Sequence, residues 1–300
     1  MRPILKKGSM LNGLSRESLG FAMCSDYDSY KDMPRLRDLL QTQYVGRAIL
    51  WFRSLSSTQE LAKNLVNAKG ALRVGGYVII ADSQLSGTGR NGREWASPRG
   101  GIWLSVILSS MLHPSKCILF SFGASLAVSE AITHCTGLES RLKWPNDILI
   151  DGKKVSGVLV DASVNSSTIE YVIIGIGVNV NVNSAEVQRD IKCQTFPCQV
   201  TSLSDELAAP CDKVRLIKNI LKALDKYYLK IESNTGYPLL DQWKDRAYDL
   251  TSKPVHVSHG AQEFTATVLG LEEDGSLVVV RDNDKVERIV SAEYSIRFIA

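Results

Sequence analysis

Residues 143–181 read KWPNDILIDGKKVSGVLVDASVNSSTIEYVIIGIGVNVN and decide the fold, because they predict three β-strands in succession. The apolar runs place these strands at Asp147–Ile150, Val155–Val160 and Thr168–Val180. Gly152 suits the tight turn between the first two strands. That hairpin brings Asp147 and Lys154 onto neighbouring strands. Such a pair is either a plain ion pair or a site in which the lysine neutralises a substrate carboxylate and the aspartate accepts a proton.

Strand and helix patterns intermix outside this stretch. Further strands are predicted at Ala48–Phe52, Tyr77–Ala81 and Ile102–Leu108. Ser57 and Glu60 have capping-box spacing at the start of a helix that runs toward Ala68. Longer helical runs span Cys117–Cys135 and Val214–Ile231, and the second is amphipathic. This mixture predicts an α/β or α+β domain.

The pattern changes after Leu250. Short strands are predicted at Val255–Val257, Glu263–Leu269, Ser276–Val280 and Val286–Val290. About fifty residues of hairpins predict a small β-barrel. We therefore divide the chain into an N-terminal extension (1–45), a catalytic domain (46–247) and a C-terminal barrel domain (248–300).

The composition of the 300-residue chain is ordinary for a globular protein, with 44% hydrophobic and 22% charged residues. A formal net charge of +3 gives no strong attraction to nucleic acid or to a membrane. No apolar run is expected to reach the roughly 18 residues of a membrane-spanning helix. The six cysteines include no Cys-x-x-Cys pair, and Cys193 and Cys198 are the nearest two. We therefore expect free thiols in a reducing, cytoplasmic compartment and no metal site.

The N-terminal residues allow two interpretations. Met1–Arg16 contains no acidic residue and four basic ones, Arg2, Lys6, Lys7 and Arg16. A basic, acid-poor start of this kind is typical of a mitochondrial or plastid transit segment. A disordered tail is the favoured interpretation, and order is expected to begin near Val45.

The stretch Gly87–Trp95, GTGRNGREW, is called the glycine loop below. It contains Gly-x-Gly-x-x-Gly, but no apolar helical pattern follows it and Pro98 interrupts the next residues, so a Rossmann turn is rejected. Glycines let backbone N–H groups approach an oxyanion closely. Arg90 and Arg93 add forked donors for phosphate or carboxylate, and Trp95 offers a face for a purine. We interpret the loop as an anion-binding loop, with a solvated basic loop as the alternative.

A third motif, Gly175-Ile176-Gly177-Val178-Asn179, lies at the end of a predicted strand, where glycines mark a close approach by backbone or ligand. In this order, the glycine loop, the block Lys143–Asp147 with Gly152, Lys154 and Gly157 after it, and this strand resemble the motifs of biotin protein ligases. The resemblance covers about residues 46–300. It implies a class II synthetase-like mixed sheet flanked by helices, and an SH3-like C-terminal barrel.

The resemblance also implies an activity. Biotin and ATP, with Mg²⁺, would give biotinyl-5′-AMP and pyrophosphate. The biotinyl group would then pass to a lysine of the biotin carboxyl carrier domain of a carboxylase such as acetyl-CoA carboxylase.

The same resemblance assigns roles to residues of this chain. The implied catalytic residues are Arg90, Asp147 and Lys154, and Asp147 would accept the proton of the target lysine. The implied biotin-binding residues are Ser57, Thr58, Gln59, Gln84, Gly87, Gly89, Arg90, Lys154 and Gly157. The implied ATP- and adenylate-binding residues are Arg90, Arg93, Trp95, Lys154 and Asn179. Trp95 is expected near the adenine and Asn179 near the nucleotide phosphates.

Two positions depart from the family pattern. Thr88 stands where many members have Arg or Lys, which removes one cation from the loop unless Arg90, Arg93 and Lys153 suffice. Gln59 stands where Asn is usual, and this longer amide is expected to be tolerated because it keeps the same polar groups.

Three other functions are weighed against this one. A lipoate or octanoate ligase would share the fold, but its substrate lacks the ureido ring of biotin. A DNA-binding regulator that senses biotinyl-adenylate would need a winged helix, and about 45 residues without helix-turn-helix spacing are too few for one. A carrier-docking scaffold without catalysis is the third. A homodimer is compatible with the sequence, and neither nucleic acid nor a membrane is expected as a partner.

Overall fold

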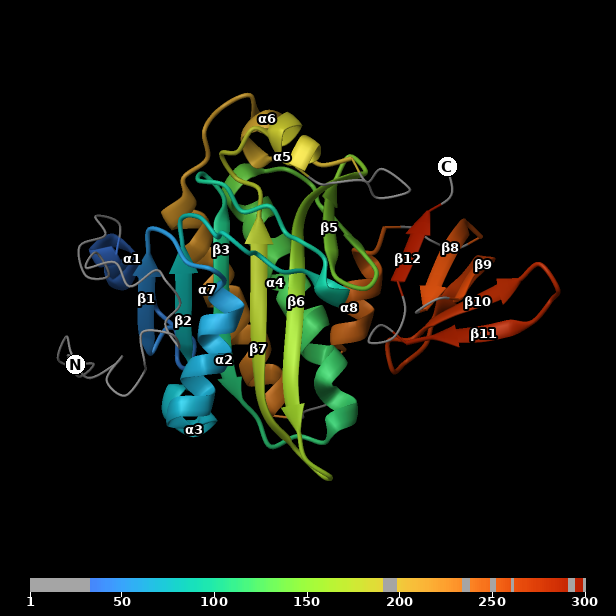
Figure 1. Cartoon of the computed structure of the whole chain (residues 1–300), viewed down its shortest axis with the longest axis horizontal. Coiled ribbons are helices and arrows are strands. Elements are labelled where there is room, and N and C mark those ends of the chain that lie inside the picture. The colour runs from blue at the N-terminus through green and yellow to red at the C-terminus, as the bar shows by residue number, and fades with distance from the viewer. Residues whose placement is uncertain are drawn as a thin grey trace.

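The computed structural model describes residues 33–190, 199–233, 238–248, 252–259, 262–290 and 295–298. A large sheet covered by helices and a smaller C-terminal sheet lie side by side (Figure 1). The basic stretch Met1–Arg16, predicted to be a transit segment or a tail, lies outside the described residues, as do Cys193 and Cys198.

The large sheet has seven strands in the order β1-β2-β3-β7-β6-β5-β4. These are β1 (Ala48–Phe52), β2 (Tyr77–Ala81), β3 (Ile102–Ser109), β4 (Arg141–Lys143), β5 (Asp147–Ile150), β6 (Lys153–Val164) and β7 (Ile169–Val178). β1 and β2 run parallel and the other neighbouring pairs run antiparallel, so the sheet is mixed, as predicted. The three strands predicted from residues 143–181 are β5, β6 and β7. Gly152, with φ 75°, makes the turn between β5 and β6.

Helices cover both faces of this sheet (Figure 1). α2 (Thr58–Lys69) and α3 (Ala71–Val74) lie on one face, and α4 (Cys117–Thr136) and α7 (Lys213–Glu232) lie on the other. Alternate residues of β2 belong to two separate buried clusters, Val78 and Ile80 to one and Ile79 to the other, as expected for a strand buried on both faces. The shorter helices are η1 (Arg90–Gly92), η2 (Pro114–Lys116), α5 (Ser184–Asp190), α6 (Leu203–Leu207) and α8 (Leu239–Asp245).

Helix α4 corrects one sequence-based expectation. The segment Pro114–Thr136 has 23 residues and a mean hydropathy of 1.3, so one helix in the described residues is long and apolar enough to span a membrane. In the fold, 67% of the apolar window of this helix is buried, because α4 packs between the sheet and α7. A helix that contacts protein on most sides is apolar all round, and its composition alone cannot be told from that of a spanning helix.

The chain is ordered before Val45, which also differs from the prediction. Helix α1 (Met33–Leu39) packs its buried Leu36 into the main core. Asp225 of α7 is 5% exposed and accepts hydrogen bonds from the backbone N–H groups of residues 43–45 at 2.7–2.8 Å. Three charge-assisted bonds stabilise this buried carboxylate and fix the path of the chain into β1.

The small sheet has five antiparallel strands in the order β11-β10-β9-β8-β12. They are β8 (Pro254–His259), β9 (Gln262–Leu271), β10 (Leu277–Arg281), β11 (Val286–Ile289) and β12 (Ser295–Phe298). The sequence did not predict β12, because four residues carry too few alternating positions to form a pattern. Closure into an SH3-like barrel stays a prediction. The Trp144 indole N–H donates to the Gly275 carbonyl at 3.0 Å and joins this sheet to the large one.

Asp225→Ala is expected to lower the free energy of unfolding by about 3 kcal/mol, because three N–H groups lose a charged acceptor away from water. Urea denaturation measures the change. Glu139→Ala is the matched control, since the exposed Glu139 pairs with Arg141 at the surface and should contribute less than roughly 0.5 kcal/mol. Equal losses in the two variants would contradict the anchoring role of Asp225.

Candidate functional site

A cavity of about 550 Å³ lies at the edge of the large sheet where β1, β2 and β7 end and β3 and β6 begin. Its walls come from the start of α2, the glycine loop, β3, the β5–β6 hairpin, β7 and residues 199–200. This volume is in the range of small-molecule and cofactor sites. The three sequence motifs, which are far apart in the chain, therefore meet at one cavity.

One part of the wall is a set of hydrogen-bonded side chains, called the polar cluster here: Ser57, Thr58, Gln59, Gln84 and Ser105. Gln84 Oε1 accepts from the backbone N–H of Thr58 at 2.8 Å and lies 3.1 Å from its hydroxyl oxygen. The Ser105 hydroxyl lies 2.9 Å from Thr58 Oγ1 and 2.8 Å from Gln59 Oε1. Ser57 is the N-cap of α2, as predicted, and its hydroxyl accepts from the N–H of Glu60. Gln84 is half-buried and the other four members are buried, and the cluster combines donors with acceptors.

The glycine loop folds back on itself over the cavity. Thr88 pairs with Glu94, and the N–H of Trp95 donates to the Gly87 carbonyl at 2.8 Å. Within the turn, Asn91 has φ 56° and Gly92 has φ 69°, which is the left-handed region that glycine and asparagine tolerate best. Thr88 and Arg93 both line the cavity, as does Arg90.

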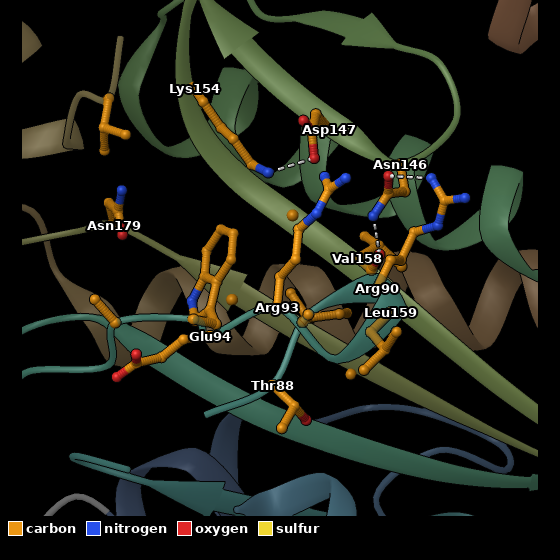
Figure 2. A pocket seen from close by; sticks show the side chains of 18 of the residues that line it. Thr88, Arg90, Arg93, Glu94, Asn146, Asp147, Lys154, Val158, Leu159 and Asn179 are labelled. Atoms are coloured by element: carbon orange, nitrogen blue, oxygen red, sulfur yellow. Dashed lines mark hydrogen bonds and ion pairs between the residues drawn. The ribbon is translucent and has the colours of Figure 1, made fainter. Parts of the chain in front are cut away.

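Charged side chains from the glycine loop and from the β5–β6 hairpin gather at another part of the cavity wall. Lys154 Nζ lies 2.6 Å from Asp147 Oδ1, and Arg90 donates to the Asn146 side-chain oxygen at 3.5 Å (Figure 2). Burial lowers the pKa of the Arg90 guanidinium below its ordinary value, the neighbouring Asp147 carboxylate raises it, and Arg93 lowers it again. The lining has four cationic side chains, Arg90, Arg93, Lys143 and Lys154, and two carboxylates, Glu94 and Asp147, so its excess positive charge favours an anionic ligand.

Strand β7 forms the floor of the cavity, and its motif has a steric explanation. Gly175, Gly177 and Asn179 are two residues apart and face the same side. A Cβ on Gly175 would lie 2.7 Å from Gln59 Oε1, and one on Gly177 would lie 2.6 Å from Trp95 Nε1. The glycines therefore let the polar cluster and the Trp95 ring lie directly on the sheet.

Trp95 lies between the charged groups and this floor. Lys154 Nζ is 4.9 Å from the centre of its ring, a cation–π distance. Two buried polar atoms beside the cavity have no hydrogen-bond partner among the described residues, Trp95 Nε1 and Asn179 Oδ1. Such atoms are rare in folded proteins, and a bound ligand is one way to satisfy them.

Comparisons with known proteins agree with this geometry. Residues 51–179 match the family model described as "Biotin/lipoate A/B protein ligase family". The "Bifunctional ligase/repressor BirA" of Bacillus subtilis is 31% identical over 256 residues, which cover 85% of this chain and 75% of that protein. The chain belongs to the biotin/lipoate A/B protein ligase family. A "Biotin--[acetyl-CoA-carboxylase] ligase" from Mycobacterium tuberculosis is 28% identical over 246 residues, 79% of this chain and 87% of that protein.

A solved structure of another family member has a similar fold. The biotin protein ligase from Aquifex aeolicus in complex with biotin and ATP is 26% identical, with a TM-score of 0.65, and the match covers 84% of this chain and 99% of that chain. The mixed α+β fold predicted from the family resemblance is therefore confirmed.

The structure brings most of the predicted site residues to the cavity. From the predicted list these are Ser57, Thr58, Gln59, Gln84, Gly89, Arg90, Arg93, Trp95, Asp147, Lys154, Gly157 and Asn179. Gly87 lies behind the lining, where a Cβ would meet Trp95 O at 2.4 Å. Lys153 pairs with Glu206 at 2.5 Å and does not line the cavity. It therefore does not supply the positive charge that the glycine loop lacks because position 88 is threonine.

Sequence reasoning missed three polar residues of the site. Ser105 is fully buried in β3, and its signal was a single hydroxyl in the apolar run Ile102–Leu108. Asn146 was quoted in a motif but given no role, although its amide donates to the Val158 carbonyl and its oxygen accepts from Arg90. Gln199 reaches the cavity beside Lys154 and no sequence pattern marked it.

Gly177→Ala is expected to displace Trp95, because the new methyl group would overlap the indole. The protein is labelled with 5-fluorotryptophan, and the ¹⁹F resonance of Trp95 is assigned as the one that is lost in Trp95→Phe. In Gly177→Ala this resonance should shift toward the frequency of a solvent-exposed tryptophan. Gly270→Ala is the control, since its Cβ would meet nothing within 4 Å. An unshifted Trp95 resonance in Gly177→Ala would refute the steric explanation of the motif.

Proposed function

We propose that this chain is a biotin protein ligase. It would condense biotin with ATP to biotinyl-5′-AMP and pyrophosphate, and then transfer the biotinyl group to a lysine of a biotin carboxyl carrier domain. The observation that supports this most is the pairing, in one cavity, of a buried polar cluster with a separate group of cations. A ligand with a polar uncharged head and an anionic tail fits that arrangement.

The polar cluster suits the ureido ring of biotin, which has one carbonyl and two N–H groups. Gln84 Nε2 donates to Ser97 Oγ at 2.9 Å and keeps a second hydrogen for a carbonyl. The Ser105 and Thr58 hydroxyl oxygens keep lone pairs for ring N–H groups. Because the cluster is buried, a ring that left these groups unpaired would cost roughly 1–3 kcal/mol for each. Lipoate lacks these groups, so biotin is the favoured substrate.

The cations suit the first chemical step. The biotin carboxylate attacks the α-phosphorus of ATP, so two anions must approach each other. Lys154, Arg90 and Arg93 line the space where they would meet, and fixed cations offset both the repulsion and the negative charge that develops. Lys154 would exchange its contact with Asp147 for the substrate oxygens.

Asp147 would then serve the second step. The incoming lysine is protonated at neutral pH and must lose a proton before its nitrogen attacks the carbonyl of the anhydride. Attack forms the amide bond and breaks the anhydride bond, which releases AMP. Of the two protons that the ammonium loses, one is taken by the Asp147 carboxylate and the other leaves on the AMP phosphate. The relatives named as acetyl-CoA-carboxylase ligases make a carrier domain of that carboxylase the proposed partner.

Trp95 and Asn179 would bind the nucleotide. Asn179 Nδ2 donates to the Thr201 carbonyl at 3.0 Å, so its Oδ1, which has no partner among the described residues, is an acceptor beside the cavity. An acceptor suits the adenine amine or a ribose hydroxyl better than the phosphate oxygens that the resemblance implied. The Trp95 face remains the proposed contact for the purine.

Mg²⁺ is proposed to enter with ATP. Among the described residues no group of three His, Cys, Asp or Glu side chains is placed to hold a metal, and the carboxylates of the lining are Asp147 and Glu94. Mg²⁺ commonly binds through one or two carboxylates together with substrate phosphates, so this lining is compatible with it. When bound, it would neutralise phosphate charge. A cytoplasmic location and a homodimer stay predictions from the sequence.

The purified protein is expected to form biotinyl-5′-AMP and pyrophosphate from biotin and ATP, and to label a carrier domain with biotin. Lys154→Ala should lower pyrophosphate release at least 100-fold, because the reacting anions lose a fixed cation. Lys222→Ala, on an exposed position of α7, should leave the rate unchanged. Absence of the adenylate with the wild-type protein, together with tighter calorimetric binding of lipoate than biotin, would favour the lipoate ligase instead.

Arg90→Gly is expected to loosen the glycine loop and let the adenylate escape, because the contact with Asn146 and a half-buried cation are lost. Release of labelled biotinyl-5′-AMP through a desalting column should be about tenfold faster than in the wild type. Arg99→Gly supplies the comparison, as Arg99 is exposed and outside the cavity lining. Retention as tight as in the wild type would remove Arg90 from this role.

A further inference from the structure

The polar cluster continues beyond the cavity as a chain of hydrogen bonds. Gln59 Nε2 donates to Asp161 Oδ2 at 3.0 Å and to the Ile173 carbonyl at 3.2 Å. Asp161 lies on β6, is 32% exposed, and pairs with Lys63 of α2 at 2.7 Å. The buried Gln59 therefore joins a surface ion pair to the hydroxyl groups of the site.

At its other end, this chain reaches the glycine loop. Gln84 Nε2 donates to Ser97 Oγ at 2.9 Å, and the Ser97 hydroxyl donates to the Trp95 carbonyl at 2.9 Å. Gln84 Oε1 accepts from the backbone N–H of Thr58 at 2.8 Å. A hydroxyl has one proton, so when Ser105 donates to Gln59 its oxygen accepts from the Thr58 hydroxyl, 2.9 Å away. Hydrogen bonds and the Thr58 residue thus link Asp161 to the loop that carries Trp95.

The direction of these bonds is set at Asp161. An ionised carboxylate only accepts hydrogen bonds, and so does a backbone carbonyl, so both acceptors require the nitrogen of the Gln59 amide on their side. Gln59 Oε1 must then face Ser105 and accept from it. A reversed amide would place an oxygen against Asp161 and a nitrogen against the Ser105 hydroxyl, which would turn the serine proton away from Gln59.

We propose that Asp161 is a positioning residue for the head group of the substrate. Through Gln59 it fixes which way the Ser105 and Thr58 hydroxyl protons point, and so keeps their lone pairs available to ring N–H groups. This inference rests on the proposed biotin ligase function and adds to it a residue that lies outside the cavity lining.

Two further observations support this role. Gly175 leaves room for the Gln59 amide, since a Cβ there would lie 2.7 Å from its oxygen. The Gln59 side chain also spans from α2 across β7 to a carboxylate on β6, and its amide contacts both strands.

The test uses four variants of the full chain and steady-state rates of adenylate formation. Asp161→Ala should raise the KM for biotin about tenfold, with the KM for ATP and kcat within twofold of wild type and an unchanged melting temperature. Asp161→Asn should restore the KM for biotin to within twofold, because its side-chain oxygen still accepts from Gln59. Lys63→Ala is the matched control, since it removes the ion pair and keeps the acceptor. Gln59→Glu should raise the KM for biotin more than Asp161→Ala does, because its carboxylate would be a third acceptor facing Asp161 and the Ile173 carbonyl.

Several results would overturn the proposal while the enzyme stays active. They are an unchanged KM for biotin in Asp161→Ala, equal losses in Asp161→Ala and Asp161→Asn, and parallel increases in the KM values for biotin and ATP. A wild-type protein that makes no biotinyl-5′-AMP would instead defeat the proposed function itself. The two failures are therefore distinguishable.

Discussion

The site depends on the absence of side chains from one face of β7. Gly175 and Gly177 leave two vacant positions on a buried strand, and Gln59 and Trp95 lie in them. Any side chain larger than hydrogen would push these groups off the sheet. Glycine in a strand interior weakens the strand, so its presence at both positions calls for a compensating contact. Here the contacts are the amide of the polar cluster and the ring of the glycine loop.

The two glycines also explain how one cavity can bind an uncharged group and an anionic group side by side. The two glycines are two residues apart, so Gln59 and Trp95 lie next to each other along the strand. Buried hydroxyls and amides gather around the first, and Lys154, Arg90 and Arg93 lie near the second. A ligand that is neutral at one end and anionic at the other can satisfy both.

The sequence predicted the order of strands well, because β5, β6 and β7 are bounded by clear turns and apolar runs. It also predicted that Asp147 and Lys154 lie on neighbouring strands, because Gly152 marks the turn between them. It could not predict the register, because the pairing shifts between Ile148 and Leu149. It could not predict Asp161, because contacts between α2 and β6 depend on tertiary packing and leave no local pattern. The same limit applies to α4, whose apolar surface has two explanations until its neighbours are known. Order before Val45 was missed for a related reason, as it depends on Asp225 some 180 residues away.

The block Lys143–Asp147 shows why the chemistry and the second sheet are physically linked. Trp144 is 1% exposed and donates to the Gly275 carbonyl of the small sheet. Gly275 has φ 80°, and a Cβ there would lie 2.8 Å from Phe122 of α4, so this turn fits against the large domain only as glycine. Two residues after Trp144, Asn146 contacts Arg90, and Asp147 follows with Lys154. Five consecutive residues thus connect the small sheet, the glycine loop and the ion pair. The residue that contacts the small sheet is therefore only three positions from Asp147, the group proposed to take the proton.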